Sequence, residues 1–151
     1  RIVTDVDLID AALAGRGINT AETATLVAIL KLGRGRVFAG VPDSDLRQFR
    51  ASMYHVEARI VDAALQVTDR ALEAGDLGLA RWALTQGLLV SPDHEDLVAG
   101  CLRTEYQAGN MDKVAELVDH LSATARRLGV DLNEDTTRII DTVTHLGRKA
   151  S

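Results

Sequence analysis

Aromatic residues and cysteine are scarce in this sequence. Aromatic side chains make up 3% of its 151 residues, and Cys101 is the only cysteine. A core with so few rings has to be built from Leu, Val, Ile and Ala, which favours helices over a β-sandwich or barrel. A lone cysteine forms no disulfide within the chain, so the fold itself needs no oxidising compartment.

Positive charge is also in short supply. The sequence has 17 Lys and Arg residues against 22 Asp and Glu residues, a net charge of −5. Because binding to the nucleic-acid backbone needs a positive field, we expect no direct contact with nucleic acid. The longest apolar runs, such as LVAIL at residues 26–30, are far too short to span a bilayer, and no secretory leader is visible. We therefore expect a cytoplasmic location and no membrane contact.

The chain does contain an ordinary globular balance of 46% hydrophobic and 26% charged residues, with helical periodicity almost throughout. Its length is typical of one domain, which covers residues 1–151. Since the sequence begins with Arg1 and not with an initiator methionine, we expect this domain to be part of a larger protein.

Start and stop signals divide the chain into about seven helices and indicate no convincing strand. The predicted stops are glycines: Gly15, Gly33, Gly75, Gly109 and Gly129. The predicted N-terminal caps are Thr4, Asn19 with Glu22, Ser91-Pro92-Asp93 and Asn133. Between Gly33 and Asp45 a glycine-rich segment predicts a structured loop whose Val37 and Phe38 fold back into the core.

The strongest periodic pattern follows Asp45 and predicts one long helix that ends near Ala74. Its apolar residues lie three and four positions apart and form one stripe: Leu46, Phe49, Met53, Val56, Ile60, Ala63 and Val67. The stripe is short and narrows to alanine at its end, so we favour packing against neighbouring helices of the same chain. A coiled-coil dimer is the alternative.

An Ala-Gly-Asp triplet around Gly75 nearly recurs as Ala-Gly-Asn around Gly109, 34 residues further on. This is the tetratricopeptide period, which has two antiparallel helices per repeat. The residues that match the small, bulky and terminal positions of that pattern are Ala80, Leu84 and Pro92 in the first copy, and Val114 and Val118 in the second. The sequence therefore predicts an all-α fold: a right-handed, tetratricopeptide-like stack of helical hairpins, capped by degenerate helices.

Four segments together resemble the bacterial transcriptional activator domain, a tetratricopeptide-like module of actinobacterial regulators. They are VTDVDLI at 3–9, LKLGRGRVFAGV at 30–41, ALEAGD at 71–76 and RRLGVDLNEDTTRII at 126–140. RGRVFAGV and ARWALTQGLLVSP also look like the versions found in actinobacterial proteins with a LysM domain and membrane segments. The resemblance implies a non-enzymatic module for protein–protein contact, either self-association or binding to a regulatory domain or the transcription machinery.

In proteins that resemble this one, the first helices of the repeats line a concave groove. The corresponding positions here are mainly acidic, with one arginine and one aromatic side chain: Asp62, Leu65, Asp69, Glu73, Asp96, Arg103, Tyr106 and Gln107. Such a set suits a basic peptide or helix. The alternative is a solvated face, or a face that the flanking helices cover.

The sequence contains no local motif that is typical of a cofactor or metal site. The GRGRVFAG segment fits neither of the glycine-rich phosphate-binding patterns. The four histidines lack the spacing of metal ligands, and Cys101 has no Cys or His beside it. We therefore expect no metal and no cofactor, and we interpret Cys101 as a small hydrophobic residue.

Two other classes of function remain as alternatives. One is accessory nucleic-acid binding through four arginines: Arg34, Arg36, Arg47 and Arg50. The other is a hydrolase or transferase, which needs a pocket of titratable groups with perturbed pKa values. Most of the acidic residues precede or open a predicted helix, where capping already explains them, so we do not expect an enzyme.

Overall fold

The structure, a computed structural model, describes residues 9, 13, 17–32 and 46–149, and all the regular structure in this part of the chain is helical. The elements are the 3-10 helix η1 (Ile18–Thr20) and the α-helices α2 (Thr23–Leu32), α3 (Leu46–Ala74), α4 (Leu77–Val90), α5 (Glu95–Ala108), α6 (Met111–Leu128) and α7 (Glu134–Lys149). The predicted all-α fold is confirmed.

The described α-helices agree with the prediction of about seven. The first predicted helix, with its cap at Thr4, falls almost wholly outside the described residues. Two of its residues, Ile9 and Leu13, are described, and both are helical and buried. The loop predicted between Gly33 and Asp45 also lies outside the described residues.

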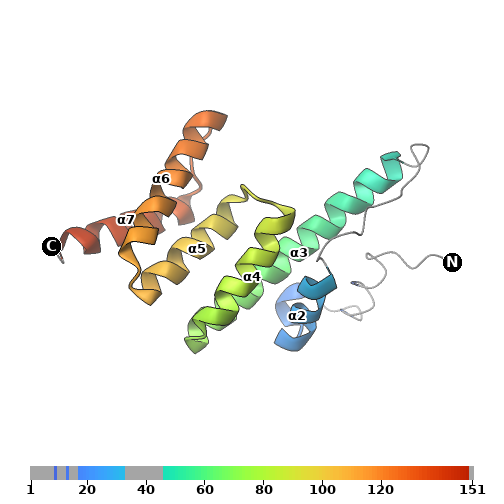
Figure 1. Cartoon of the computed structure of the whole chain (residues 1–151). Coiled ribbons are helices and arrows are strands. Elements are labelled where there is room, and N and C mark those ends of the chain that lie inside the picture. Colours follow the sequence, from blue (N-terminus) through green and yellow to red (C-terminus); the bar gives the residue numbers. More distant parts are fainter. Residues whose placement is uncertain (1–8, 10–12, 14–16, 33–45, 150–151) are drawn as a thin grey trace.

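The helices form a stack of hairpins (Figure 1). α3 packs against α4, α5 packs against α6, and α4 also packs against α5, which joins the two hairpins. At one end α2 contacts α3 and α4, and at the other end α7 contacts α5 and α6. The two predicted repeats therefore lie in the middle of the stack, with α2 and α7 on either side.

Gly75 and Gly109 occupy matching bends between the two helices of each hairpin. Their φ angles are 75° and 77°, a conformation that a residue with a Cβ adopts only under strain. After each glycine the next N–H donates to a carbonyl five residues back, over 2.8 Å from Asp76 to Ala71 and 2.9 Å from Asn110 to Glu105. This is the Schellman arrangement, and it ends α3 and α5 in the same way.

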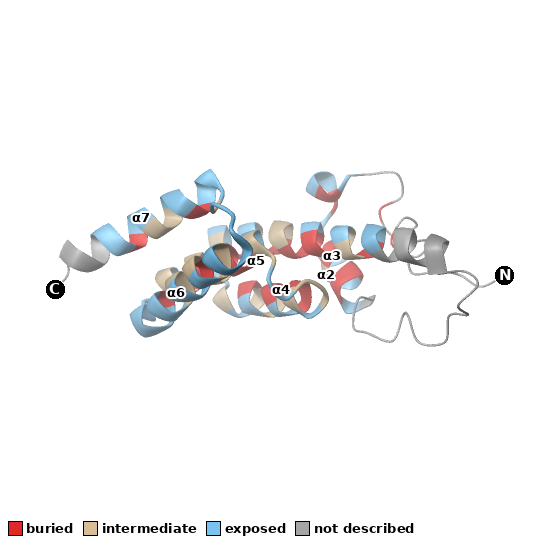
Figure 2. Ribbon diagram, turned by 90° about the horizontal axis from the view of Figure 1, so that it is seen from above, coloured by how far each residue is buried: buried red, intermediate tan, exposed pale blue. Residues whose placement is uncertain are grey.

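The predicted apolar stripe of α3 is buried wherever its side chains are described. Val56, Ile60, Ala63 and Val67 all belong to one core cluster, which also contains buried residues of α2, α4 and α5. Figure 2 shows buried positions along α3. This confirms packing within the chain for these four positions. A second cluster joins the last three helices through five buried residues: Val98, Leu102, Val114, Leu121 and Val143.

The predicted cap at Asn19 is wrong. Asn19 lies within η1, and α2 begins only at Thr23, after Glu22. The Asn19 carbonyl accepts a 3.1 Å hydrogen bond from Arg70 of α3, which also donates over 2.8 Å to the carbonyl of Ala21. A contact with a distant helix therefore holds this segment in a tight turn.

The predicted cap of α5 is also wrong. Ser91 and Pro92 follow the end of α4 as predicted, but the residue at the N-cap of α5 is His94. Asp93 instead lies 3.5 Å from the guanidinium group of Arg127, at the end of α6. Its carboxylate thus links the connection between α4 and α5 to the second hairpin.

Candidate functional site

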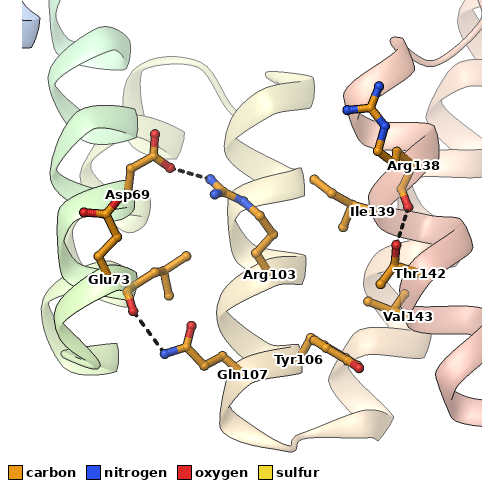
Figure 3. Close-up of a pocket in the computed structure, with 10 residues that line it drawn as sticks. Asp69, Glu73, Arg103, Tyr106, Gln107, Arg138, Ile139, Thr142 and Val143 are labelled. Carbon is orange, nitrogen blue, oxygen red and sulfur yellow. Dashed lines mark hydrogen bonds and ion pairs between the residues drawn. The ribbon is translucent and has the colours of Figure 1, made fainter.

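An open hollow with a volume of about 700 Å³ lies between three helices that are distant in sequence. α3 contributes Asp69, Leu72 and Glu73, α5 contributes Arg103, Tyr106 and Gln107, and α7 contributes Arg138, Ile139, Thr142 and Val143. We call it the α3–α5–α7 groove. Figure 3 shows α5 in the middle, with the side chains of α3 on one side and those of α7 on the other.

A second hollow of about 420 Å³ adjoins this groove and shares Asp69, Arg103, Arg138 and Ile139 with it. Its other lining residues include Leu65 and Asp96. The structure therefore brings seven of the eight predicted groove residues to the two hollows: Leu65, Asp69, Glu73, Asp96, Arg103, Tyr106 and Gln107. Asp62 is exposed on α3 but lines neither hollow.

Two contacts between α3 and α5 shape the groove. Arg103 donates a 2.8 Å hydrogen bond to the carboxylate of Asp69, and one turn further on Gln107 donates over 3.2 Å to the carbonyl of Leu72 (Figure 3). The Asp69 and Arg103 side chains are 50% and 37% exposed, so water screens this ion pair. The Arg103 and Gln107 side chains of α5 are thus already engaged by α3.

The wall formed by α7 was not predicted from the sequence. Ile139 and Val143 present apolar side chains to the groove, and Arg138 lies beside them. The Arg138 guanidinium is paired with two carboxylates of its own helix, 3.1 Å from Glu134 and 3.2 Å from Asp135. The strong apolar periodicity of α7 was the available signal, but it did not indicate which helices α7 would face.

Asn133 fixes the position of α7. Its side-chain oxygen accepts a 2.8 Å hydrogen bond from the N–H of Thr136, which confirms the predicted cap. Its side-chain nitrogen donates over 2.9 Å to Asp96, and its backbone N–H donates over 2.7 Å to Glu95. Because Glu95 and Asp96 lie in the first turn of α5, this one asparagine both starts α7 and ties it to α5.

The charges around the groove are mainly negative. Four carboxylates and two guanidinium groups line the groove and the adjoining hollow: Asp69, Glu73, Asp96, Asp135, Arg103 and Arg138. Among the described residues, each arginine is paired with at least one of these carboxylates, whereas Glu73 is in no ion pair. Asp69 and Glu73 are the two carboxylates that line the groove itself, and of these only Glu73 has no ion-pair partner among the described residues.

Three titratable groups outside the groove have perturbed pKa values: Arg81, Cys101 and Glu105. Arg81 of α4 hydrogen-bonds Glu105 of α5 over 2.8 Å and holds the pKa of that carboxyl below its ordinary value. Burial is the main cause that raises the pKa of the Cys101 thiol, and the charge of Glu105 raises it further. Since the thiolate is the nucleophilic form, a raised pKa lowers the fraction of Cys101 in that form.

The arginines of the nucleic-acid alternative are not described: Arg34 and Arg36 lie outside the described residues, and Arg47 and Arg50 are on α3 without described side chains. Within residues 9, 13, 17–32 and 46–149, no three His, Cys, Asp or Glu side chains are placed to share a metal ion. No described helix is both long enough and apolar enough to cross a membrane.

Comparison with known proteins gives no match, whether to protein-family models, to curated proteins or to solved structures.

Proposed function

We propose that this chain is a non-enzymatic protein–protein interaction module of the bacterial transcriptional activator type, and that its contact surface is the α3–α5–α7 groove. The observation that carries the proposal is the lining of this groove. Its α3 and α5 walls contain repeat-equivalent positions, Asp69 and Arg103, and the groove has an apolar floor with charged side chains around it. This combination is typical of surfaces that receive a peptide or helix.

The parent protein in this proposal is a transcriptional regulator, or an actinobacterial protein with a LysM domain and membrane segments. The sequence resemblance described above supports this part. In a regulator the module acts by position: when a partner occupies the groove, the module holds or releases a neighbouring DNA-binding domain. In a membrane-anchored parent it serves as a docking platform.

The test is a selection of binding peptides from an unbiased display library, with the purified chain as the target. Thr142→Trp places a bulky side chain in the groove. Thr85→Trp on α4 is its matched control, because both threonines are exposed and each donates to the carbonyl four residues back, over 2.9 Å and 2.8 Å. Either substitution removes the same kind of hydrogen bond, and only Thr142 lines the groove.

We expect peptides that bind the wild type and the Thr85→Trp variant and lose about tenfold or more in affinity for Thr142→Trp. Selected peptides that bind all three proteins equally would place the contact surface elsewhere. A selection that yields no binding peptide would count against an interaction module of this kind.

A further inference from the structure

The floor of the α3–α5–α7 groove is apolar. Leu72 and Tyr106 lie on the α3 and α5 side, and Ile139 and Val143 lie on the α7 side. Figure 3 shows Tyr106 and Ile139 in the space between α5 and α7. Tyr106 and Ile139 are each only partly buried, so apolar area remains open to an incoming side chain.

The walls offer few free hydrogen-bonding groups to an extended peptide. Helix backbones satisfy their own N–H and C=O groups, so no sheet edge is present to pair with an added strand. Two of the polar side chains are engaged as well: the Gln107 amide donates to the carbonyl of Leu72, and the Thr142 hydroxyl donates to the carbonyl of Arg138. An occupant that brings its own backbone hydrogen bonds, which means a helix, fits these walls better than an extended chain.

The charge of the groove determines which sign of charge an occupant should carry. Asp69 is compensated by Arg103, but Glu73, one turn further along α3, is in no ion pair among the described residues. On the opposite wall, Arg138 faces two carboxylates, Glu134 and Asp135, so α7 adds no net positive charge there. A partner with Lys or Arg at the position of Glu73 gains an ion pair, whereas an acidic partner meets repulsion.

We infer that the occupant of the α3–α5–α7 groove is a cationic amphipathic helix of another protein. Its apolar stripe packs between Tyr106 and Ile139, and a lysine or arginine beside the stripe pairs with Glu73. The inference rests on the proposed function, since it names the chemistry of the partner for that same groove.

The probes are three synthetic helical peptides of roughly 16 residues, long enough to be helical in water. They share one apolar stripe at positions i, i+3, i+4 and i+7, and their remaining positions carry Lys, Gln or Glu. Fluorescence anisotropy gives the dissociation constants for the wild type, Glu73→Lys and Asp119→Lys. Asp119 is an exposed carboxylate on α6 outside the groove, so its variant has the same net charge as Glu73→Lys.

Glu73→Lys is compatible with the fold because Glu73 lies in the last turn of α3, where the helix dipole favours a cation. We expect the Lys peptide to bind the wild type about tenfold more tightly than the Glu peptide at low salt, with the Gln peptide between them. Glu73→Lys should weaken the binding of the Lys peptide about tenfold, whereas Asp119→Lys should weaken it less than about twofold. Raising the salt concentration should reduce these differences in the dissociation constant, because dissolved ions screen the charges.

The outcomes separate this inference from the proposed function. If Thr142→Trp abolishes binding but the three peptides bind equally, the groove is an interaction site and its preference for cations is refuted. If Glu73→Lys and Asp119→Lys weaken the Lys peptide equally, the net charge of the chain is the cause, and the role of Glu73 is refuted. If no helical peptide binds while the display selection yields extended peptides that depend on Thr142, the helical occupant is refuted and the interaction module stands.

Discussion

Arg103 donates a 2.8 Å hydrogen bond to Asp69, a residue 34 positions earlier in the chain. Asp93 and Arg127 are also 34 positions apart in the sequence, and their side chains lie 3.5 Å from each other. Gly75 and Gly109, also 34 residues apart, end the first helices of successive hairpins, α3 and α5, with nearly equal φ angles. Equivalent positions of successive hairpins thus lie next to each other, and the sequence period is also a spatial one.

Asn133→Ala should release α7 from the stack. The substitution removes the cap on Thr136 and the hydrogen bond to Asp96, so we expect the free energy of unfolding to fall by about 1–3 kcal/mol. Urea denaturation measures the loss, and amide exchange should show α7 exchanging faster than α4. Asn110→Ala is the control, because Asn110 stands at the N-cap of α6 without a side-chain cap hydrogen bond, and its side chain makes one 3.2 Å hydrogen bond, to Glu105. Equal losses in the two variants would contradict this account of Asn133.

Gly87→Ala should destabilise the protein although it improves helix propensity. A Cβ at Gly87 would lie 2.9 Å from Leu97 Cδ2 and 3.0 Å from the Cβ of Ala64, and both neighbours are fully buried. We expect a net loss of about 1 kcal/mol, because overpacking outweighs the gain in propensity. Gly78→Ala, whose Cβ would meet nothing closer than 3.7 Å, should stabilise α4 by about 0.5 kcal/mol. Thermal melts of the two variants should therefore shift in opposite directions.

Ile60→Ala tests the buried stripe of α3. Ile60 is 2% exposed in the first core cluster, so its truncation should cost about 2–5 kcal/mol. Tyr54 lies on the same helix and is 67% exposed, so Tyr54→Ala should change the stability by less than about 0.5 kcal/mol. A melting temperature of Ile60→Ala equal to that of the wild type would refute the packing described for α3.

Glu105→Gln should reduce the stability in a pH-dependent way. The hydrogen bond from Arg81 lowers the pKa of Glu105 from 4.5, so the folded state favours the carboxylate. Because the pKa of Glu105 is lower in the folded state, its ionised carboxylate stabilises the fold above pH 4.5. This stabilisation is lost as the pH falls through the pKa that Glu105 has in the folded state. We expect Glu105→Gln to be less stable than the wild type near neutral pH, and the difference to shrink below pH 4.5. Glu116→Gln, which removes an exposed pair with Lys113, is the control and should show a small difference at every pH.

The sequence by itself determined the helices, because the signals that start and stop them are local. Gly75, Gly109 and Gly129 end their helices where predicted, since a positive φ is favourable only without a Cβ. α6 ends at Leu128, directly before the predicted stop at Gly129, and α7 begins at Glu134, directly after the predicted cap at Asn133. The positions predicted for the groove came from the resemblance to proteins whose first repeat helices line a groove, and most of them line the two adjoining hollows.

Only the tertiary structure decided what closes that surface. Its third wall comes from α7, and Asn133 sets the place of α7 through two residues of α5 that lie 37 and 38 positions earlier. The cap predicted at Asn19 was wrong because the segment forms η1, whose turn closes on the Gly17 carbonyl, and Arg70 from α3 adds a hydrogen bond to the Asn19 carbonyl. Helical periodicity reports which side of a helix is apolar. Which helix that side meets depends on packing and hydrogen bonds between residues far apart in the chain, and these leave no local pattern.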